Sequence, residues 1–546
     1  MIGDDAAFPM LDDAEIALLD TLGTRRRVTA GETLYRAGDA TYDFFAVTSG
    51  VVEITTAGSD GTDQVVVRHD ARRFLGELNL LTGLRVFVTA TVVESGEVIA
   101  VPAAAMRRAL ATEPALSDKV LAAFIARRAI LMTGAASAIR LVGSRLSPES
   151  LRIREFLARA GVPHEWLDTE NDPVLDDTLQ DLAITAEDLP VVIAPGAVMR
   201  NPTIGEVASY LGLTVESLPE RKFDLVIVGG GPAGLAAAVY GATEGLETLG
   251  LERATVGGQA GSTSRIENYL GFPMGVSGTE LTQRAIVQAE KFGAHLTAPC
   301  SAASLRECSG HLVVHLEDGT EVVGRAVIVA SGVRYRRLDA QRIEDFEQSV
   351  YYAATENEMR QCSGSPVVIV GGGNSAGQAA LYLAQTSPVT IAIRGDDIGA
   401  AMSSYLVDRV VANLRITVRT NTRVTALDGD REMRHARLAT PEGDVTVPCE
   451  ALFSFIGAEP NSDWLSKCAA VDEHGFIRTD LELDANALGE RWDVLGRRPL
   501  PFETSHPGLF AVGDVRSGST KRVAAAVGEG SAAVRSVHEY LAFAHS

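Results

Sequence analysis

A glycine-rich loop at residues 229–234 is the part of the sequence best suited to bind a phosphate group. The apolar run at 224–228 precedes the letters GGGPAG, and a small-residue helical stretch, LAAAVYGATEG, follows them. Glycines let the backbone approach a diphosphate, and the helix start supplies free N–H groups. Glu252 closes the next apolar run, roughly twenty residues on, where a carboxylate accepts from ribose hydroxyls. This predicts a dinucleotide site, rather than a turn without ligand, at Gly229, Gly231, Pro232, Ala233 and Gly234.

A second loop of the same kind lies at residues 371–376 and differs at the residue that meets the ribose. The run VVIV leads into GGGNSA, and a helical stretch and the strand VTIAIR follow. That strand ends in Arg394, and a guanidinium suits a ribose 2′-phosphate, which a carboxylate would repel. The alternative for Arg394 is a solvated strand end. We expect NADPH, with NADH possible, at Gly371, Gly373, Asn374, Ser375, Ala376 and Arg394.

The elements that must position these loops divide the 546-residue chain into several domains. From residue 223 onward, runs of Val, Ile, Leu and Ala alternate with helical stretches, the pattern of a parallel sheet covered on both faces. Residues up to about 109 are β-rich, and helices are expected at 103–110 and 114–133. Between these parts lies a short strand–helix–strand unit that begins at 140–144. Its helix is expected to start with Ser147 as N-cap and Pro148 in the first turn.

Composition excludes several classes of function. Lys and Arg number 49 against 71 Asp and Glu, for a net charge of −22, so nucleic acid or membrane binding is not the expected main activity. The longest apolar runs are too short to span a bilayer, and the acidic start MIGDDAAFPML does not resemble a secretory signal. The five cysteines form no CxxC and no zinc spacing, so we expect no metal and a cytoplasmic location.

Residues 223–546 resemble the low-molecular-weight thioredoxin reductases. The resemblance rests on GGGPAG, then GGQ at 257–259, IENYLGFP at 266–273 and GLFAVGD at 508–514, in that order. It implies a flavoprotein in which a rotating NADPH domain reduces FAD by hydride transfer, in a homodimer. By the family pattern, further FAD contacts come from Glu252, Gly258, Gln259, Asn268, Gly513, Asp514, Arg522, Val523 and Ala524.

One departure from that family bears directly on the chemistry. The reductases carry a CxxC just before the second glycine loop, and here Ala353 and Glu356 occupy the cysteine positions. Neither side chain can attack a disulfide. Cys362 lies nearby without a cysteine close to it in sequence, and we interpret it as structural, so no catalytic residue is assigned. The electron acceptor is therefore open: a quinone, oxygen, a protein partner or a disulfide docked directly.

The middle unit resembles a thioredoxin or glutaredoxin without its cysteines. A CPxC would lie in the loop before the helix, where the helix dipole lowers a thiol pKa, and the sequence there is Ser144-Arg145-Leu146-Ser147. Serine hydroxyls cannot carry disulfide redox chemistry. The alternative is a small α/β docking domain.

The N-terminal part resembles a cyclic-nucleotide-binding domain. Its phosphate cassette corresponds to residues 74–85, FLGELNLLTGLR. By that pattern, backbone N–H groups from Gly76 to Leu78 and the Arg85 guanidinium would hold the cyclic phosphate of cAMP or cGMP, and Glu77 would accept from the ribose. Leu75 and the bulky pair Val86-Phe87 depart from the family pattern. The alternative is a degenerate β-roll used for contacts.

Together these resemblances predict a multidomain chain: a β-roll with helices at 1–138, a thioredoxin-like α/β unit at 139–215, and two Rossmann-like α/β domains. The FAD domain is expected at 222–342 and 451–546, with the NADPH domain inserted at 343–450. The expected function is hydride transfer from NADPH through FAD to an unidentified acceptor, under cyclic nucleotide control. Two alternatives are a nucleotide and flavin sensor with little turnover, and a thioredoxin reductase that uses non-standard cysteines.

Overall fold

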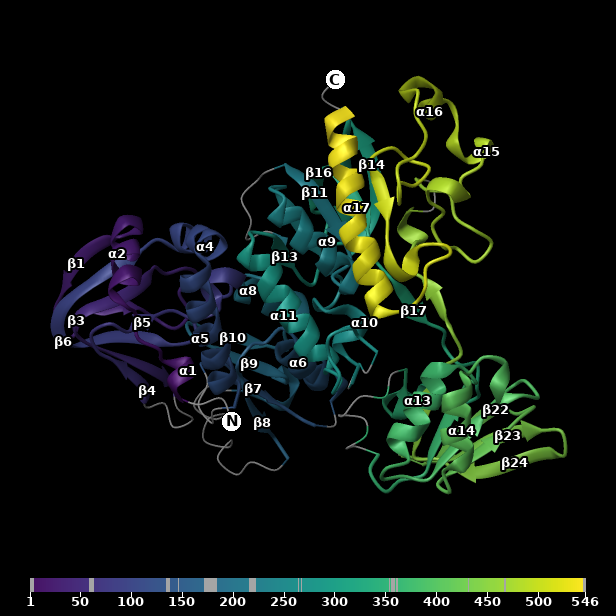
Figure 1. The fold of residues 1–546 in the computed structure, drawn as a ribbon. Helices are drawn as coiled ribbons and strands as arrows, with labels where there is room; N and C mark the ends of the chain where they lie inside the picture. Colours follow the sequence, from purple (N-terminus) through teal and green to yellow (C-terminus); the bar gives the residue numbers. More distant parts are fainter. Residues whose placement is uncertain are drawn as a thin grey trace.

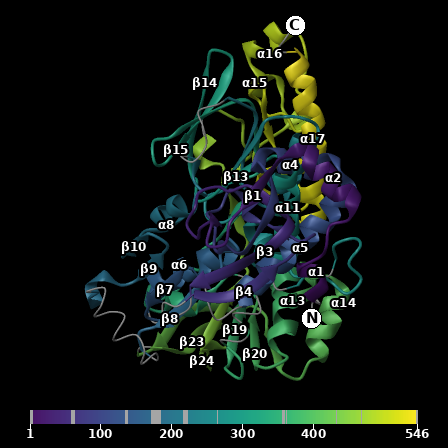
Figure 2. The same cartoon turned by 90° about the vertical axis from the view of Figure 1, so that its left-hand side faces the viewer.

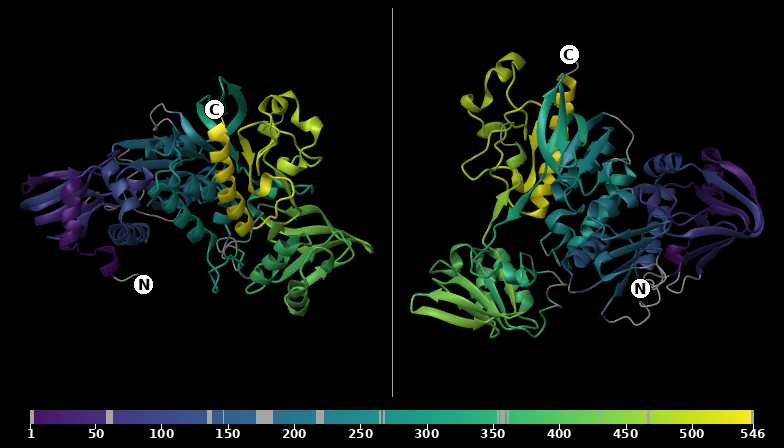
Figure 3. Two further views of the ribbon diagram at one scale, coloured as in Figure 1. Left: turned by 45° about the horizontal axis from the view of Figure 1, so that its top comes forward. Right: turned by 180° about the vertical axis from the view of Figure 1, so that it is seen from behind.

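The computed structural model divides the chain into four units, the last of which is inserted in sequence into the third (Figure 1). It describes residues 4–57, 63–133, 138–145, 147–170, 184–215, 222–263, 265–266, 268–352, 354, 359, 362–430, 432–465 and 468–543. We call the parts the N-terminal unit (4–133), the middle unit (138–215), the first nucleotide unit (222–335 with 458–543) and the second nucleotide unit (344–454). The N-terminal and second nucleotide units lie at opposite ends of the molecule (Figures 1 and 3).

The N-terminal unit is a β-rich fold closed by a long helix. Its antiparallel strands run in the order β1–β6–β3–β4, with β2 on β6 and β5 on β3. Phe74 stacks on Phe44 of the sheet and meets Phe124 of α5, and all three rings are fully buried. The expected helix at 103–110 extends two residues further, and the one at 114–133 is confirmed. The elements are α1 (Asp4–Ala7), α2 (Asp13–Leu22), β1 (Thr24–Val28), β2 (Thr33–Tyr35), β3 (Phe44–Ala57), β4 (Asp63–His69), β5 (Phe74–Leu75), α3 (Asn79–Thr82), β6 (Thr89–Val101), α4 (Ala103–Thr112) and α5 (Pro114–Thr133).

In its described residues, the middle unit is a mixed sheet of four strands with the helices α6 and α8. Its strand order is β10–β9–β7–β8, and only β7 and β8 are parallel. The predicted N-cap is confirmed, because Ser147 Oγ accepts from the Ser150 N–H at 3.2 Å and Pro148 opens the helix. The elements are β7 (Arg140–Gly143), α6 (Pro148–Arg159), β8 (Glu165–Asp168), η1 (Ala186–Asp188), β9 (Val191–Ala194), β10 (Ala197–Arg200) and α8 (Ile204–Leu211).

The first nucleotide unit is built on the predicted parallel sheet. Strands β13, β12, β11, β16 and β27 are parallel, and an antiparallel hairpin of β14 and β15 extends from β16. Helices α9 and α17 touch closely, since a Cβ at Gly530 would lie 2.1 Å from the Ala233 carbonyl oxygen. The elements are β11 (Phe223–Val228), α9 (Pro232–Thr243), β12 (Thr248–Leu251), α10 (Gly258–Gly261), α11 (Gly278–Lys291), β13 (His295–Thr297), β14 (Ala302–Cys308), β15 (His311–Leu316), β16 (Glu321–Val329), β17 (Val333–Tyr335), β26 (Ala458–Pro460), η5 (Asp463–Leu465), η6 (Asp480–Glu482), α15 (Ala485–Leu488), α16 (Glu490–Leu495), β27 (Leu509–Ala511), η7 (Gly513–Val515) and α17 (Val523–Phe543).

The second nucleotide unit is a smaller parallel sheet, β18–β25–β19–β20–β21, with an antiparallel sheet of β22, β23 and β24 beside it. The expected boundary at 451 falls inside this unit, because residues 451–454 form β25 and pair with β19. The chain returns to the first nucleotide unit through β26, which pairs with β17. The elements are η3 (Glu344–Ser349), β18 (Val350–Tyr351), β19 (Val367–Val370), α13 (Asn374–Leu383), β20 (Val389–Ala392), η4 (Ile398–Ala400), α14 (Ser404–Ala412), β21 (Ile416–Arg419), β22 (Arg423–Gly429), β23 (Met433–Thr440), β24 (Gly443–Pro448) and β25 (Ala451–Ser454).

The middle unit is hydrogen-bonded to the units before and after it. The Arg85 N–H donates to the Leu211 carbonyl at 3.2 Å, and the Ala298 N–H donates to the Leu213 carbonyl at 3.1 Å. Helix α3 of the N-terminal unit also contacts α11 directly, and Figure 2 looks along this stack with the N-terminal unit in front of α11. In the part of the chain that the structure describes, no helix combines the length and the apolar character needed to cross a membrane.

Candidate functional site

The first glycine loop forms a tight backbone turn at a helix start, here called a cradle, that larger residues could not make. Gly231 is the N-cap of α9 and Pro232 is its first residue. A Cβ at Gly234 would lie 1.8 Å from the Gly229 carbonyl oxygen, so the loop and helix approach each other only because this residue is glycine. A Cβ at Gly231, by contrast, would lie 3.9 Å from the Gly258 Cα atom, an ordinary van der Waals distance, and Gly231 itself borders a cleft. The loop thus presents the start of α9 to a cleft.

Glu252 ties this loop to the end of β12. Its carboxylate accepts from the Gly230 N–H at 2.6 Å and from the Ala254 N–H at 3.1 Å. The acid therefore lies at the loop, as the sequence pattern predicts, with lone pairs left for ribose hydroxyls.

The cleft in front of the loop has a volume of about 420 Å³, within the range of small-molecule sites. Of the residues expected to contact FAD, ten line it: Gly231, Pro232, Ala233, Glu252, Gly258, Gln259, Gly513, Asp514, Arg522 and Val523. The others are outside the lining. Gly229 and Gly234 shape the loop from behind, Asn268 is exposed, and Ala524 follows the lining residues on α17.

The polar groups of the cleft fit a dinucleotide such as FAD. The Thr255 hydroxyl is buried and has no hydrogen-bond partner among the described residues, so a ligand can supply one. Burial raises the pKa of the Asp514 carboxyl, Lys521 opposes that shift, and Glu529 adds to it. Helix α17 begins at Val523 in the lining, so its positive end points at the cleft. The cleft therefore offers donors and a dipole for an anionic ligand, and a carboxyl for its hydroxyls.

The second glycine loop repeats this construction. Gly373 is the N-cap of α13, and a Cβ at Gly371 would lie 2.4 Å from the Phe455 carbonyl oxygen. Asn374 does not point its amide oxygen to a ligand here, because that oxygen accepts from the Ser403 N–H at 2.7 Å. Ser375 is exposed at the helix start, and Ala376 is buried beneath it.

Two arginines end neighbouring strands beside this loop. Arg394 follows β20 and is exposed, and Arg419 ends β21, which pairs with β20. The Arg419 Nε atom is buried and has no partner in the described part of the chain. Arg419 is not among the residues expected from the sequence, although it closes an apolar strand, RITVR, in the same way that Arg394 closes VTIAIR. The two arginines thus follow adjacent parallel strands, and guanidinium groups of this kind can bind an anionic group.

The segment that would hold a redox pair lies mostly outside the described residues, including Ala353 and Glu356. Just before it, Tyr352 stacks on Tyr335, with ring centroids 6.1 Å apart, and Tyr335 lines the cleft. Cys362 and Cys449 are both buried in the second nucleotide unit. Burial raises the pKa of the Cys449 thiol to about 12, so this cysteine is a poor source of thiolate.

The loop before α6 in the middle unit is held by ionic contacts. The Ser144 hydroxyl donates to Glu170 at 2.6 Å, and Arg145 donates to the same carboxylate at 3.1 Å. Ser147 caps the helix, and Leu146 lies outside the described residues. This loop acts as a helix start fixed to the end of β8.

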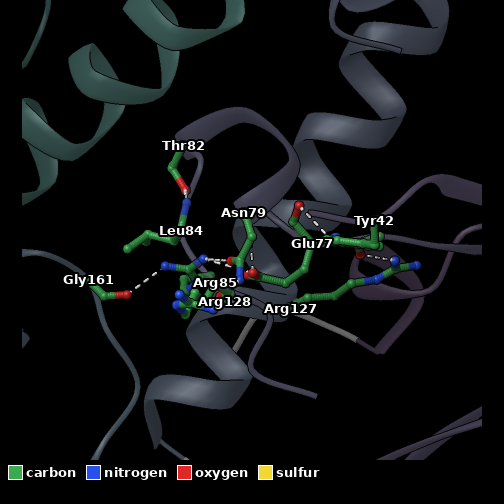
Figure 4. Close-up of polar contacts among 10 residues, drawn as sticks. Tyr42, Glu77, Asn79, Thr82, Leu84, Arg85, Arg127, Arg128 and Gly161 are labelled. Carbon is green, nitrogen blue, oxygen red and sulfur yellow. Dashed lines mark hydrogen bonds and ion pairs between the residues drawn. The ribbon is translucent and has the colours of Figure 1, made fainter. Parts of the chain in front are cut away.

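The predicted ribose acceptor of the N-terminal cassette is bound to another residue of the chain (Figure 4). The Glu77 carboxylate forms a buried ion pair with Arg128 of α5, at 2.5 and 2.7 Å. The same guanidinium donates to the Asn79 amide oxygen and, at 2.6 Å, to the Gly161 carbonyl of the middle unit. The Glu77 N–H donates to the Tyr42 hydroxyl at 2.8 Å.

The predicted phosphate-binding Arg85 points to the middle unit. Its guanidinium donates to the Tyr210 carbonyl and, at 2.8 Å, to the Gly38 carbonyl, and it lies 5.0 Å from the centre of the Tyr210 ring. Arg127 donates to the Gly76 carbonyl at 2.7 Å and covers the cassette from α5. The cavity left beside Gly76, Glu77 and Arg127 measures about 40 Å³, room for little more than water. The cassette is closed in this structure.

Comparison with known proteins covers two parts of the chain. The family model described as pyridine nucleotide-disulphide oxidoreductase matches residues 223–530, and the model described as cyclic nucleotide-binding domain matches 25–113. The thioredoxin reductases of Bacillus subtilis and Listeria innocua are each 30% identical, over 59% of this chain and 96% and 95% of theirs. A component of the alkyl hydroperoxide reductase of Staphylococcus aureus is 26% identical, over 68% of this chain and 71% of its own.

Two solved structures resemble the nucleotide units. The thioredoxin reductases of Lactococcus lactis, in its FR conformation, and of T. acidophilum each align with a TM-score of 0.52 at 27% identity. Each alignment covers 59% of this chain and 99% of the other.

Proposed function

The chain belongs to the pyridine nucleotide-disulphide oxidoreductase family, and on this premise we propose that it passes hydride equivalents from NADPH through FAD to an acceptor that docks directly at the flavin. It is a thioredoxin reductase-like flavin NAD(P)H oxidoreductase of a family that uses FAD and NADPH. One observation carries the proposal: the chain builds two glycine cradles, each at a helix N-terminus, and joins them through the β17–β26 pair.

In this proposal the first nucleotide unit holds FAD, which supplies the hydride-accepting group. The N–H groups at the start of α9 bind the diphosphate, and Glu252 and Asp514 accept from hydroxyls of the cofactor. The N-terminus of α17, which also borders the cleft, would favour negative charge on the bound cofactor. The residues assigned to FAD are Gly229, Gly231, Pro232, Ala233, Gly234, Glu252, Gly258, Gln259, Asn268, Gly513, Asp514, Arg522, Val523 and Ala524.

The second nucleotide unit would bind NADPH and bring it to the flavin. Gly371, Gly373 and the start of α13 take the diphosphate, with Asn374, Ser375 and Ala376 in the first turn. Arg394 and Arg419 would bind the 2′-phosphate. The connection through two short strands is thin enough for one unit to turn against the other, and the Tyr335–Tyr352 stack would be broken or remade in that turn.

The acceptor would reach the flavin without an internal thiol relay. The buried Cys449 has a raised pKa, and Cys362 is buried as well, which argues against a reductase that uses these two cysteines. A quinone, oxygen, a protein partner or an external disulfide then remains as acceptor. Each would be tested by adding it to the reduced protein under anaerobic conditions, except oxygen, which is added last.

We propose that the middle unit is a thioredoxin-like fold that serves as a docking unit. Its strand order, with a parallel β7–β8 pair followed by two antiparallel strands, supports this topology. The share of this chain that aligns with the alkyl hydroperoxide reductase component exceeds residues 223–546 and therefore extends into this unit. The hydrogen bonds from Ser144 and Arg145 to Glu170 occupy the place where a redox motif would be.

The cyclic-nucleotide-binding domain would regulate the reductase from a closed state. The expected contacts through Gly76, Glu77, Leu78 and Arg85 require Arg85 to leave Tyr210 and Glu77 to leave Arg128. A cyclic nucleotide would therefore compete with the middle unit for the cassette and loosen their joint. Titration calorimetry with cAMP and cGMP tests this. If no binding heat is detected at millimolar nucleotide, the cassette serves as a contact element and not as a nucleotide site.

Anaerobic stopped-flow spectroscopy tests the main proposal. NADPH should bleach the flavin absorbance of the purified protein within seconds, and a competent acceptor should restore it. A flavin that NADPH leaves unbleached, together with tight cAMP binding, would favour the alternative of a sensor with little turnover. A protein that purifies without flavin and takes none up would contradict both.

A further inference from the structure

A cation from the middle unit lies in the cleft that the first nucleotide unit forms. Arg159 is the last residue of α6, and it lines the cleft together with Gly231 and Glu252. We propose that Arg159 binds the diphosphate of FAD, so that the middle unit is part of the cofactor site. The inference rests on the proposed function, because it takes FAD as the ligand of this cleft.

The position of Arg159 follows from its contact with the loop at Gly258. The Arg159 Nη2 atom donates to the Gly258 carbonyl at 3.2 Å. Gly258 in turn packs against the glycine loop, because a Cβ there would lie 2.7 Å from the Gly231 Cα atom. The guanidinium is therefore beside the start of α9, where a dinucleotide places its diphosphate.

The guanidinium keeps most of its donors for a ligand. Apart from Gly258, its partner within the described part of the chain is Glu155, in an ion pair of 3.6 Å, and that carboxylate side chain is 68% exposed. An arginine carries five N–H groups in a planar fork that matches phosphate oxygens. One hydrogen bond and one long ion pair leave the rest of that fork open to the cleft.

The charges around the cleft give Arg159 a specific place. Lys521 and Arg522 stand immediately before α17, and Asp514 lies in the η7 turn. The remaining charged residues of the described lining are Arg159 and Glu252, and the Glu252 carboxylate accepts from the Gly230 N–H of the glycine loop. A diphosphate brought next to the Glu252 carboxylate would be repelled, and Arg159 supplies the compensating charge.

The end of α6 is docked firmly enough to hold this side chain in place. Gln283 of α11 donates to the Arg159 carbonyl at 3.0 Å. The bond between the Ala298 N–H and the Leu213 carbonyl fixes the same face of the middle unit. A cation in the last turn is also favoured by the helix dipole. FAD bound in the cleft would thus touch two units and tie them together.

The test is FAD affinity of the full chain, measured by fluorescence titration of the FAD-free protein. R159Q removes the charge and retains a donor for the Gly258 carbonyl. We expect it to weaken FAD binding by about tenfold or more, the value of a lost charge-assisted hydrogen bond. The binding of ADP, which carries the same diphosphate, should be weakened by a similar factor in R159Q. R152A removes an exposed arginine from the same helix and should bind FAD like the wild type.

The thermal unfolding of the FAD-free protein separates a ligand contact from a structural one. R159Q should melt like the wild type. If the melting temperature of R159Q is lower than that of the wild type, the FAD affinity of R159K is measured. An affinity restored by the lysine supports the proposal, and an affinity that stays weakened overturns it. Wild-type affinity of R159Q for FAD and ADP, or an equal loss in R152A, would overturn it as well. A wild-type chain that binds no FAD would instead contradict the proposed function.

Discussion

The first glycine loop and the N-terminal cassette are two phosphate-binding patterns in one chain, and they are in opposite states. Around the first loop, the partners of the Glu252 carboxylate in the described residues are the Gly230 and Ala254 N–H groups, and a cleft of about 420 Å³ is open. Around the cassette, Glu77 and Arg85 are bound to Arg128 and to the middle unit, and about 40 Å³ remains. Both regions carry the backbone that a phosphate needs, and only the first has its polar groups available.

The difference shows what a binding pattern does and does not guarantee. The glycines fix where the chain can turn, which is a local property. Whether an arginine or a glutamate is free depends on the surfaces brought against it. The middle unit meets both regions and acts differently on each: it occupies Arg85 through Tyr210 and adds Arg159 to the open cleft.

The largest expected effect is on FAD binding and comes from placing a larger residue in the first glycine loop. In G234A the new Cβ would lie 1.8 Å from the Gly229 oxygen, so the loop must move and FAD binding should be lost. The measurement is the flavin content of the purified protein. G528A is the matched control, because its Cβ meets nothing within 4 Å on α17. Full flavin content in G234A would contradict the cradle.

The next largest effect is on stability and comes from removing the ion pair that holds the N-terminal cassette. E77Q leaves the buried Arg128 charge without its partner, which should cost about 3 kcal/mol of unfolding free energy. Urea unfolding followed by circular dichroism measures it. E53Q removes the partner of the exposed Arg68 and should cost less than about 1 kcal/mol. Equal stabilities of the two variants would show that the cassette is not held by this pair.

The glycine loop of the second nucleotide unit, proposed to bind NADPH, extends the comparison. R394A should raise the KM for NADPH about tenfold and leave the KM for NADH unchanged, because only NADPH carries the 2′-phosphate. Steady-state kinetics with a dye acceptor measures both. R437A, an exposed arginine of β23, serves as the control. A parallel rise for NADH would assign Arg394 to another role.

A pH dependence is expected at the contact of α11 with the N-terminal unit. Burial raises the pKa of Glu290 from 4.5 to about 8, and the nearby Arg107 and Arg128 only partly oppose this. The folded state therefore keeps a proton that the unfolded chain releases above about pH 4.5, so stability should fall as the pH rises from about 5 to 8. In E290Q, the melting temperature should change less with pH over that range. An unchanged slope would place the titration elsewhere.

Much of the fold could be predicted because short stretches of sequence determine its helices and strands. The apolar runs before residues 229 and 371 became β11 and β19, and Ser147 and Pro148 opened α6 as expected. The predicted domain boundary at residue 451 differs from the structure for a non-local reason. Residues 451–454 form a strand by local pattern, and only pairing with β19 shows which sheet they join. Arg419 was missed on similar grounds, because its place beside Arg394 depends on the β20–β21 pairing.

The sequence by itself determined the two cradles, because a glycine loop before a helix is specified by residues within a few positions of one another. The tertiary structure decided which charged side chains remain available to a ligand. Arg85 and Tyr210 are far apart in the chain, as are Arg159 and Gly258, and no local pattern encodes either contact. Hydrogen bonding and ion pairing act through space, so packing between units closed one phosphate site and completed the lining of another.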